Sequence, residues 1–314
     1  MLVYRGFSQT APGATALTIG NFDGVHVGHR VLLARLKAAA VRQQLLPAAL
    51  TFEPHPREFF TRESAPARLS TLREKLELLA DEGVELAYVC HFNARFAALS
   101  AEEFIERILV GCARVKHLII GDDFSFGAGR RGNFALLREA GESFGFQVEA
   151  MDSVTLDGER ASSSAVRDAL AAGQLEHAAR LLGRPYVIDG RVVHGDKVGR
   201  QLGFATANIR IKHERPPLLG VFAVEVRGVD GLTLQGVANL GFRPSANQTI
   251  QALLEIHLFD FAREIYGTHL KVRFLHKLRD EMKFPSFDAL KAQIASDVRE
   301  ARLYFHRRGT EAQR

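Results

Sequence analysis

The stretch Thr15–Arg30, TALTIGNFDGVHVGHR, joins a short apolar run to the start of a helical pattern. The run Thr15–Gly20 predicts a strand, and the apolar spacing from Val27 to about Gln44 predicts a helix. In open α/β sheets, ligands bind at the carboxyl ends of the strands, and a helix start favours phosphate through its free N–H groups and its positive dipole end. The stretch therefore predicts a phosphate site at a strand-to-helix turn.

Two histidines, His26 and His29, lie three residues apart in this turn, and Gly24 and Gly28 stand beside them. The glycines allow the backbone to approach a ligand closely. An imidazolium at this place can stabilise the charge that builds up on phosphates during a transfer reaction. Two histidines at a helix start are also compatible with solvated helix caps or with a pair of metal ligands.

Strands and helices alternate through the rest of the first half, which favours an α/β domain whose parallel sheet is covered by helices on both faces. The strand candidates are Pro47–Phe52, Glu85–Phe92, His117–Gly121 and Gln147–Met151, and the helix candidates are Leu72–Glu82, Ala101–Val110, Phe134–Phe144 and about Ser164–Leu182.

The pattern changes after Gly183, where short β-like segments separated by glycine-rich turns predict a small barrel. These segments are Tyr186–Val193, Val221–Arg227, Thr233–Ala238, Ala252–Phe261 and His269–Leu275, and a terminal helix is expected over Phe287–Phe305. A chain of 314 residues suits two domains, which we expect at 1–183 and 184–314.

Bulk composition narrows the classes of protein. Hydrophobic residues make up 46% and charged residues 25%, as in ordinary globular proteins, and the net charge of +5 suits small anions without excluding nucleic acid. The two cysteines, Cys90 and Cys112, are too few for a disulfide framework or a zinc site. The chain starts without a signal pattern and contains no apolar run of membrane-spanning length, so a cytoplasmic protein without membrane contact is expected.

Three serines, Ser162, Ser163 and Ser164, precede Arg167 at the start of the last helix of the first half. Small hydroxyls at a helix start with an arginine one turn further on can clamp a phosphate. Serines at this place are also ordinary helix caps, and both interpretations can hold together.

The segment Gly195–Asn208, GDKVGRQLGFATAN, and the acid Glu255 are the candidates of the second half. Thr206 and Asn208 face the same side of a strand, and their oxygens suit magnesium, although strands and turns use the same residue types without any metal. Glu255 has apolar neighbours on both sides in ALLEIHLFDF, which suggests that its carboxylate is buried. Burial raises the pKa of a carboxylate and makes it a stronger base. The alternative is a surface acid on an edge strand.

Taken together, four motifs resemble the adenylyltransferase module of the prokaryotic bifunctional riboflavin kinase/FAD synthetases. They are GNFDGVHVGHR, FEPHP (Phe52–Pro56), GDDFSFG (Gly121–Gly127) and SSSAVR (Ser162–Arg167). The resemblance implies a Rossmann-like nucleotidyltransferase domain that moves an adenylyl group from ATP to FMN and gives FAD.

The same resemblance assigns roles to single residues of the first half. His26 and His29 would contact the ATP phosphates, with His29 and Arg167 acting in catalysis. Asn21 and Asp123 would hold the nucleotide and its magnesium, and Ser163, Ser164 and Arg167 would bind phosphates. Phe52, Pro54, His55 and Pro56 would lie on the flavin side. The family usually has threonine at the position of Ser164.

The second half resembles the riboflavin kinase module in GRVVHGDKVGRQLGF, TAN, GVANLGFRP (Gly236–Pro244) and LLEIHLFDF. The resemblance implies a small β-barrel that phosphorylates riboflavin with ATP. Thr206 and Asn208 would bind magnesium, Glu255 would take the proton of the ribityl hydroxyl, and the loop with Gly195, Lys197 and Gly199 would cover the nucleotide. The family usually has proline where this chain has Ala205.

Three other classes of protein fit the sequence less well. The glycines of Gly127–Gly132 fit a dinucleotide motif, with Glu149 at a suitable distance, but the motif does not open directly from the predicted strand. A class I aminoacyl-tRNA synthetase would need a lysine-rich partner motif that is absent. Arginines scattered without interleaved aromatics disfavour a nucleic-acid-binding protein. An enzyme that retains only one of the two activities stays open, as does the oligomeric state.

Overall fold

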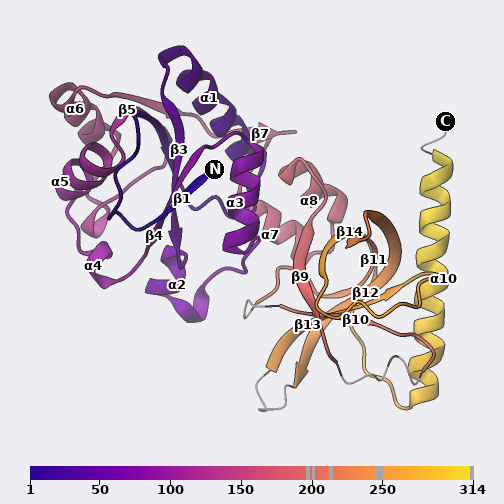
Figure 1. The fold of residues 1–314 in the computed structure, drawn as a ribbon. Helices are drawn as coiled ribbons and strands as arrows, with labels where there is room; N and C mark the ends of the chain where they lie inside the picture. The colour runs from indigo at the N-terminus through magenta and orange to yellow at the C-terminus, as the bar shows by residue number, and fades with distance from the viewer. Residues whose placement is uncertain (196–198, 200–201, 212–214, 245–249, 312–314) are drawn as a thin grey trace. The chain divides into compact units, whose positions relative to one another are not determined.

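The computed structural model describes residues 1–195, 199, 202–211, 215–244 and 250–311 (Figure 1). They form two compact units. The first comprises Met1–Pro66 and Ser70–Ser163, and the second comprises Ala67–Leu69 and Ser164–Arg314.

The first unit is built on a six-stranded sheet of order β1-β4-β3-β2-β5-β6, in which every pair is parallel. Its strands are β1 Leu2–Arg5, β2 Thr15–Ile19, β3 Leu46–Glu53, β4 Leu86–His91, β5 Val115–Gly121 and β6 Gln147–Met151. Every residue of the central strand β2 is buried, as in sheets covered on both faces. The predicted parallel sheet is confirmed.

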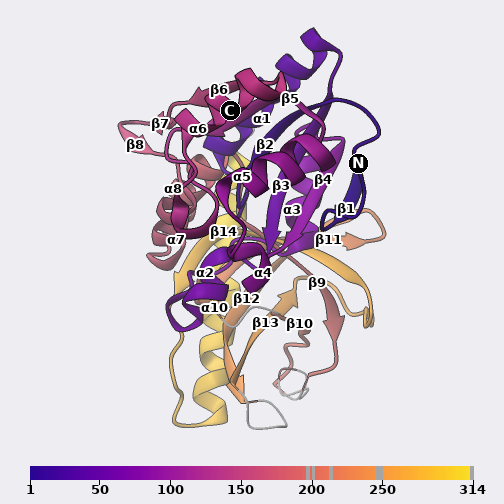
Figure 2. The same ribbon diagram turned by 90° about the vertical axis from the view of Figure 1, so that its left-hand side faces the viewer.

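Helices cover both faces of this sheet (Figure 2). α1 Val27–Gln43 and α3 Leu72–Asp81 pack on one face, and α5 Ala101–Glu103, the π-helical η2 Phe104–Cys112 and α6 Phe134–Phe144 pack on the other. The remaining elements of this unit are short: α2 Pro56–Phe60, α4 Ala94–Ala97, the 3₁₀ turns η1 Arg62–Ser64 and η3 Ala128–Arg130, and the hairpin of β7 Thr155–Leu156 with β8 Glu159–Arg160. Successive residues of β5 enter different cores. Leu118 and Ile120 pack with η2 and α6, whereas Ile119 packs with α1 and α3.

The strand order β4-β3-β2-β5-β6 reverses direction at β2 and β5, which is the arrangement of doubly wound folds. The carboxyl ends of these two neighbouring strands are therefore where a ligand crevice is expected. α1 follows β2 at this edge, so the histidine turn lies at the switch point.

The second unit contains a closed six-stranded barrel of order β10-β13-β12-β11-β14-β9, with antiparallel pairs throughout. Its elements are α7 Ser163–Ala171, α8 Leu175–Leu182, β9 Val187–Val193, β10 Ala207–Arg210, β11 Gly220–Val229, β12 Leu232–Pro244, β13 Ile250–Leu258, β14 His269–Arg279 and α10 Phe287–Glu311. The predicted barrel and terminal helix are confirmed.

The terminal helix α10 packs on the outer face of the barrel. Phe305 and Ala301 form a small core with Val221, Ala223 and Leu275. Phe222 and Val224 alternate with Val221 and Ala223 along β11, and they are buried on the opposite side of the strand. Two arginine–aspartate pairs, Arg279 with Asp297 and Arg302 with Asp260, add to this contact.

One expectation for local structure is wrong. The helix predicted over Ser164–Leu182 is interrupted, because Gly173 adopts a φ of 72° between α7 and α8.

Two other segments agree with the sequence. The helix predicted over Ala101–Val110 is present, and most of it is π-helical. The glycines of Gly127–Gly132, where a dinucleotide site was disfavoured, do not open a helix; Gly132 instead bridges back to Phe126, and its α-carbon lies against that ring, where a Cβ would not fit.

In the part of the chain that the structure describes, no helix combines the length and the apolar composition needed to cross a membrane.

The two arginine–aspartate pairs give a prediction for stability. Asp297 is 5% exposed and binds the Arg279 guanidinium through both oxygens, at 2.9 and 2.7 Å. Asp297→Ala should lower the free energy of unfolding by about 2–3 kcal/mol. This is less than the loss expected on breaking a fully buried ion pair, because the Arg279 side chain is 20% exposed to water. Asp260→Ala is the matched control, since Asp260 makes the same bidentate contact but is 79% exposed. Urea unfolding followed by circular dichroism should separate the two variants; equal effects would contradict the account.

Candidate active sites

In the first unit, His26 is the cap of α1 and not a solvent-exposed group. Its side chain is 7% exposed, and its Nδ1 accepts a hydrogen bond of 3.4 Å from the backbone N–H of His29. The two imidazole rings are stacked with centroids 3.8 Å apart. Gly28 permits this packing, since a Cβ there would lie 3.1 Å from the His26 ring. The cap interpretation of the sequence is therefore correct for His26, although the cap is buried.

His29 has an unusual electrostatic environment. Desolvation by the surrounding protein, followed by the charges of His26 and Lys75, holds the pKa of His29 well below its ordinary value. Its Nδ1 is buried and has no hydrogen-bond partner among the described residues. Burial therefore opposes the charged imidazolium form of His29, and only an anion close to the ring would offset this effect.

The turn before α1 has a strained backbone. Phe22 and Val25 adopt φ angles of 48° and 40°, which are rare for residues with a Cβ and rarer for a β-branched one. Both side chains are buried in the core between the sheet and α1, and this packing holds the turn in place. Strained backbone angles persist only where the surrounding packing holds them, and they are found most often at active sites and ligand-binding sites.

A buried aspartate fixes the same turn. Asp23 is 1% exposed, and its Oδ1 accepts hydrogen bonds from the backbone N–H and the hydroxyl of Ser70, at 3.0 and 3.1 Å. The Ser70 hydroxyl oxygen in turn accepts from the backbone N–H of Gly24, and Ser163 donates to the Asp23 carbonyl at 2.9 Å. Asp23 lies within the motif GNFDG, but no role was predicted for it from the sequence. Its position between Gly20 and Gly24, in the turn before the helix, was the signal that could have identified it.

A buried lysine lies behind the turn. Lys75 is fully buried, and its Nζ donates to the Thr51 hydroxyl at 3.3 Å, while that hydroxyl donates to the Asn21 carbonyl at 3.1 Å. The side-chain Oδ1 of Asn21 is buried and has no partner in the described part of the chain. Asn21 therefore presents an unsatisfied acceptor at the carboxyl end of β2, which fits its predicted role toward a nucleotide or its metal. Lys75 and Thr51 were missed by sequence reasoning.

Asp123 follows the neighbouring strand β5 at the same edge of the sheet. Its carboxylate is 70% exposed and forms an ion pair of 2.8 Å with Arg160 of β8. The structure thus places Asp123 at the switch point, on the surface and already paired with a cation.

Five phenylalanines cluster beyond the carboxyl ends of β3 and β4. Centroid separations of the contacting rings lie between 5.2 and 5.8 Å, and α2 brings two of them to the cluster after His55 caps its start. The members are Phe52, Phe59, Phe60, Phe92 and Phe96. Phe60 is 64% exposed, so the cluster offers an open aromatic surface. The resemblance had pointed to Phe52, Pro54, His55 and Pro56, so the other four rings of the cluster were missed.

Ser164 and Arg167 belong to the second unit, at the start of α7. Arg167 donates from Nε to the carbonyl of Ala67 at 2.6 Å. Their predicted contact with phosphates stays a prediction.

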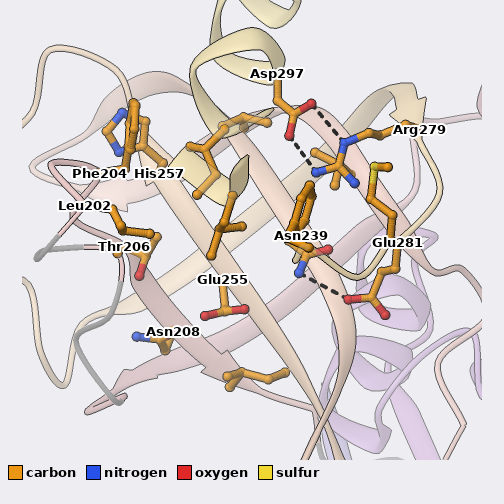
Figure 3. A pocket seen from close by; sticks show the side chains of 18 of the residues that line it. Leu202, Phe204, Thr206, Asn208, Asn239, Glu255, His257, Arg279, Glu281 and Asp297 are labelled. Atoms are coloured by element: carbon orange, nitrogen blue, oxygen red, sulfur yellow. Dashed lines mark hydrogen bonds and ion pairs between the residues drawn. The ribbon is translucent and has the colours of Figure 1, made fainter. Parts of the chain in front are cut away.

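The second unit contains a pocket of about 440 Å³ between one face of the barrel and α10 (Figure 3). Thr206, Asn208, Asn239, Glu255 and His257 line it from the strands and from the segment before β10, and Leu290, Ile294 and Asp297 line it from α10. Gly199 also lines it, whereas Lys197 lies outside the described residues.

Strand register brings three polar residues into one row across this pocket. Asn208 of β10 pairs with Glu255 of β13, and Glu255 pairs with Asn239 of β12. Thr206, two residues before Asn208, lines the same pocket. Gly195 leaves room for the Asn208 amide, because a Cβ at that position would lie 2.5 Å from its Nδ2. Sequence reasoning expected Thr206, Asn208 and Glu255 in one site, and the structure brings them together.

The burial expected for the Glu255 carboxylate is wrong, and so is the alternative of an edge strand. β13 is flanked by two strands of the closed barrel. Its apolar residues Leu254 and Ile256 point to the barrel core, whereas the Glu255 side chain is 31% exposed in the pocket and pairs with Arg243 at 3.0 Å. The two-residue repeat of a strand separates neighbours in sequence onto opposite faces. Arg243, within the quoted motif GFRP, was missed.

Comparisons with known proteins agree with this geometry. Residues 8–165 match the family model described as FAD synthetase, and residues 182–305 match the one described as riboflavin kinase. Relatives include the bifunctional riboflavin kinase/FMN adenylyltransferase of Haemophilus influenzae, 51% identical over 93% of this chain and 94% of that protein. The protein of the same description from Escherichia coli K12 is 49% identical over 97% of this chain and 98% of its own length.

Among solved structures, a crystal structure described as a macrolide-efflux protein from Streptococcus pneumoniae has a TM-score of 0.79 and 28% identity, covering 95% of this chain and 97% of that one. Both family models thus match in order, and the relatives align over nearly their whole length. The chain belongs to the family of bifunctional riboflavin kinase/FMN adenylyltransferases.

Proposed function

We propose that this protein phosphorylates riboflavin with ATP in the barrel unit and then transfers an adenylyl group from a second ATP to FMN in the sheet unit, as its relatives' names imply. The observation that carries the proposal is the row Asn208–Glu255–Asn239 in a pocket of the second unit, together with the paired histidines at the switch point of the first. The cytoplasm, where flavins and ATP are available, is the location that we propose.

In the kinase step, Glu255 accepts the proton of the terminal ribityl hydroxyl. The hydroxyl oxygen then bonds to the γ-phosphorus of ATP, and the bond from that phosphorus to the bridging oxygen breaks, so FMN forms and ADP leaves. Phosphoryl transfer needs positioning and charge stabilisation more than covalent help from the protein. A carboxylate fixed on a barrel strand meets the geometric demand on a general base.

Magnesium fits the donors beside this base. The Asn208 side chain is mostly buried, and it and Thr206 offer neutral oxygens that face the same pocket. Among the described residues, no three His, Cys, Asp or Glu side chains are grouped to hold a metal ion. Thr206 and Asn208 would therefore hold magnesium only together with phosphate oxygens and water, as is usual for this ion. When bound, the metal would neutralise charge on the ATP phosphates.

In the adenylyl step, a phosphate oxygen of FMN attacks the α-phosphorus of ATP and pyrophosphate leaves. The attacking group is already an anion, so this step needs no strong base. The buried Nδ1 of His29 is the atom that we assign to a phosphate oxygen, since it has no partner among the described residues. Phosphate anions favour the protonated imidazole, so ATP binding would give His29 the charge that burial opposes. The phenylalanine cluster beyond β3 and β4 supplies an aromatic surface for the flavin ring.

Glu255→Gln should abolish most of the kinase activity. Glutamine keeps the size and hydrogen bonding of the side chain but cannot accept the proton, so the rate of FMN formation should fall by about 10²–10⁴. Adenylyl transfer to supplied FMN should persist, and circular dichroism of the variant checks that the barrel is folded. Chromatography of the flavin products measures both rates. A kinase rate equal to that of the unmodified protein would leave Glu255 without a catalytic role.

His29→Ala should have the opposite effect. Loss of a positioned charge-stabilising group costs about a hundredfold or more in rate, so FAD formation should nearly stop while riboflavin phosphorylation continues. His117→Gln is the matched control, because His117 is another buried histidine of the same unit, bonded to Gln43 at the far end of α1. Parallel loss of both activities in a folded His29 variant would refute the assignment.

We also propose that the kinase module begins near Arg184, between α8 and β9. A fragment of residues 184–314 should then fold and phosphorylate riboflavin, and it should make no FAD because His26, His29 and Arg167 are missing. The fragment 164–314 is the control, since it keeps α7 and α8, of which α8 packs on β14. A soluble, cooperatively unfolding 184–314 fragment without kinase activity, beside an active 164–314 fragment, would move the boundary to the start of α7.

A further inference from the structure

Arg243 of β12 connects two carboxylates of the barrel pocket. Its Nη2 donates to Oε2 of Glu255 at 3.0 Å, and its Nη1 donates to Oε1 of Glu281 at 3.1 Å. All three side chains line the pocket. A guanidinium is suited to this task because its donors have a fixed planar geometry.

Glu281 is itself held in place. Asn239 donates from Nδ2 to the same Oε1 that Arg243 binds, at 3.2 Å, as Figure 3 shows. The backbone leaves space for this carboxylate at Gly241, where a Cβ would overlap Glu281. Glu281 therefore holds the guanidinium of Arg243 through Nη1, the nitrogen that does not bind Glu255.

The other polar groups around Glu255 have different partners. His257 contacts the Ala205 carbonyl through Nδ1 at 3.0 Å, and Arg279 is bound to Asp297 through two hydrogen bonds. Asn208 and Asn239, the cross-strand neighbours of Glu255, are neutral. Within the described part of the chain, Arg243 is thus the cation that binds Glu255, and it occupies Oε2.

The guanidinium keeps its charge in this position. Burial opposes the charged form, but the carboxylates of Glu255 and Glu281 outweigh that effect and raise the pKa of Arg243. The pair is partly exposed, so its contribution to stability is small and its geometry matters more.

We propose that Arg243 is a positioning residue for the kinase step: it fixes one oxygen of Glu255 so that the other meets the ribityl hydroxyl, and Glu281 holds Arg243 for this purpose. The inference rests on the proposed role of Glu255 as the base. It differs from a direct role of Arg243 on the transferred phosphate, because a positioning residue loses its effect when the group that it positions is removed.

The test is a set of variants in the full-length protein, assayed for FMN formation with saturating ATP and magnesium. A misplacement of about 1 Å can cost about a hundredfold in rate, so Arg243→Gln should lower kcat by about 10–100-fold with little change in the KM for riboflavin. Arg243→Lys should restore part of the rate, and Glu281→Gln should lower kcat by a smaller factor. Arg273→Gln is the matched control, since Arg273 forms a similar half-buried pair with Glu225 elsewhere in the barrel; its kinetics should be unchanged.

The double variant Glu255→Gln with Arg243→Gln decides between the two roles. The proposal predicts a rate within about twofold of Glu255→Gln alone, because effects of residues that act as a unit are not additive. A further large loss in the double variant, or an unchanged kcat in Arg243→Gln, would overturn the proposal. Full activity of Glu255→Gln would instead show that Glu255 is not the base. Failure of the proposed kinase mechanism is therefore distinguishable from failure of the role proposed for Arg243. Cooperative unfolding followed by circular dichroism reports folding of the barrel in every variant, and adenylyl transfer to FMN reports only on the sheet unit.

Discussion

The two-residue repeat of side chains along β-strands is the constraint on which both candidate sites depend. In the barrel, Leu254 and Ile256 of β13 enter the core, so Glu255 between them faces the pocket. In the sheet, both faces of β5 are buried against helices, so polar groups can gather only beyond the strand ends. The fold thus restricts polar side chains that could bind a ligand to the pocket of the barrel and to the ends of the sheet strands.

The two sites handle charge differently. In the sheet unit, burial lowers the pKa of His29 and so opposes its charged form, and buried groups such as Asp23 and Lys75 hold the turn around it. In the barrel unit, the proposed base Glu255 forms an ion pair with Arg243. This difference matches the chemistry that we propose, because an anionic FMN needs charge stabilisation, whereas a neutral hydroxyl must also lose a proton.

Much of the fold and of the candidate residues could be predicted from the sequence. Strand and helix periodicity predicted both architectures, and the resemblance to the riboflavin kinase module implied that Thr206, Asn208 and Glu255 act in one site. The missed features depend on contacts between distant segments: Arg243 reaches Glu255 only through the register of β12 and β13, and Ser70 meets Asp23 only after α3 has folded against the sheet. The break at Gly173 was missed because an isolated glycine in a helical pattern is often tolerated.

The central claim is that one chain carries out two successive ATP-dependent reactions. The most direct measurement is a time course of flavins and nucleotides after the full-length protein is mixed with riboflavin, magnesium and excess ATP. The account predicts FMN with ADP first, followed by FAD with pyrophosphate. A single flavin product that persists at long times with ATP still in excess would contradict it.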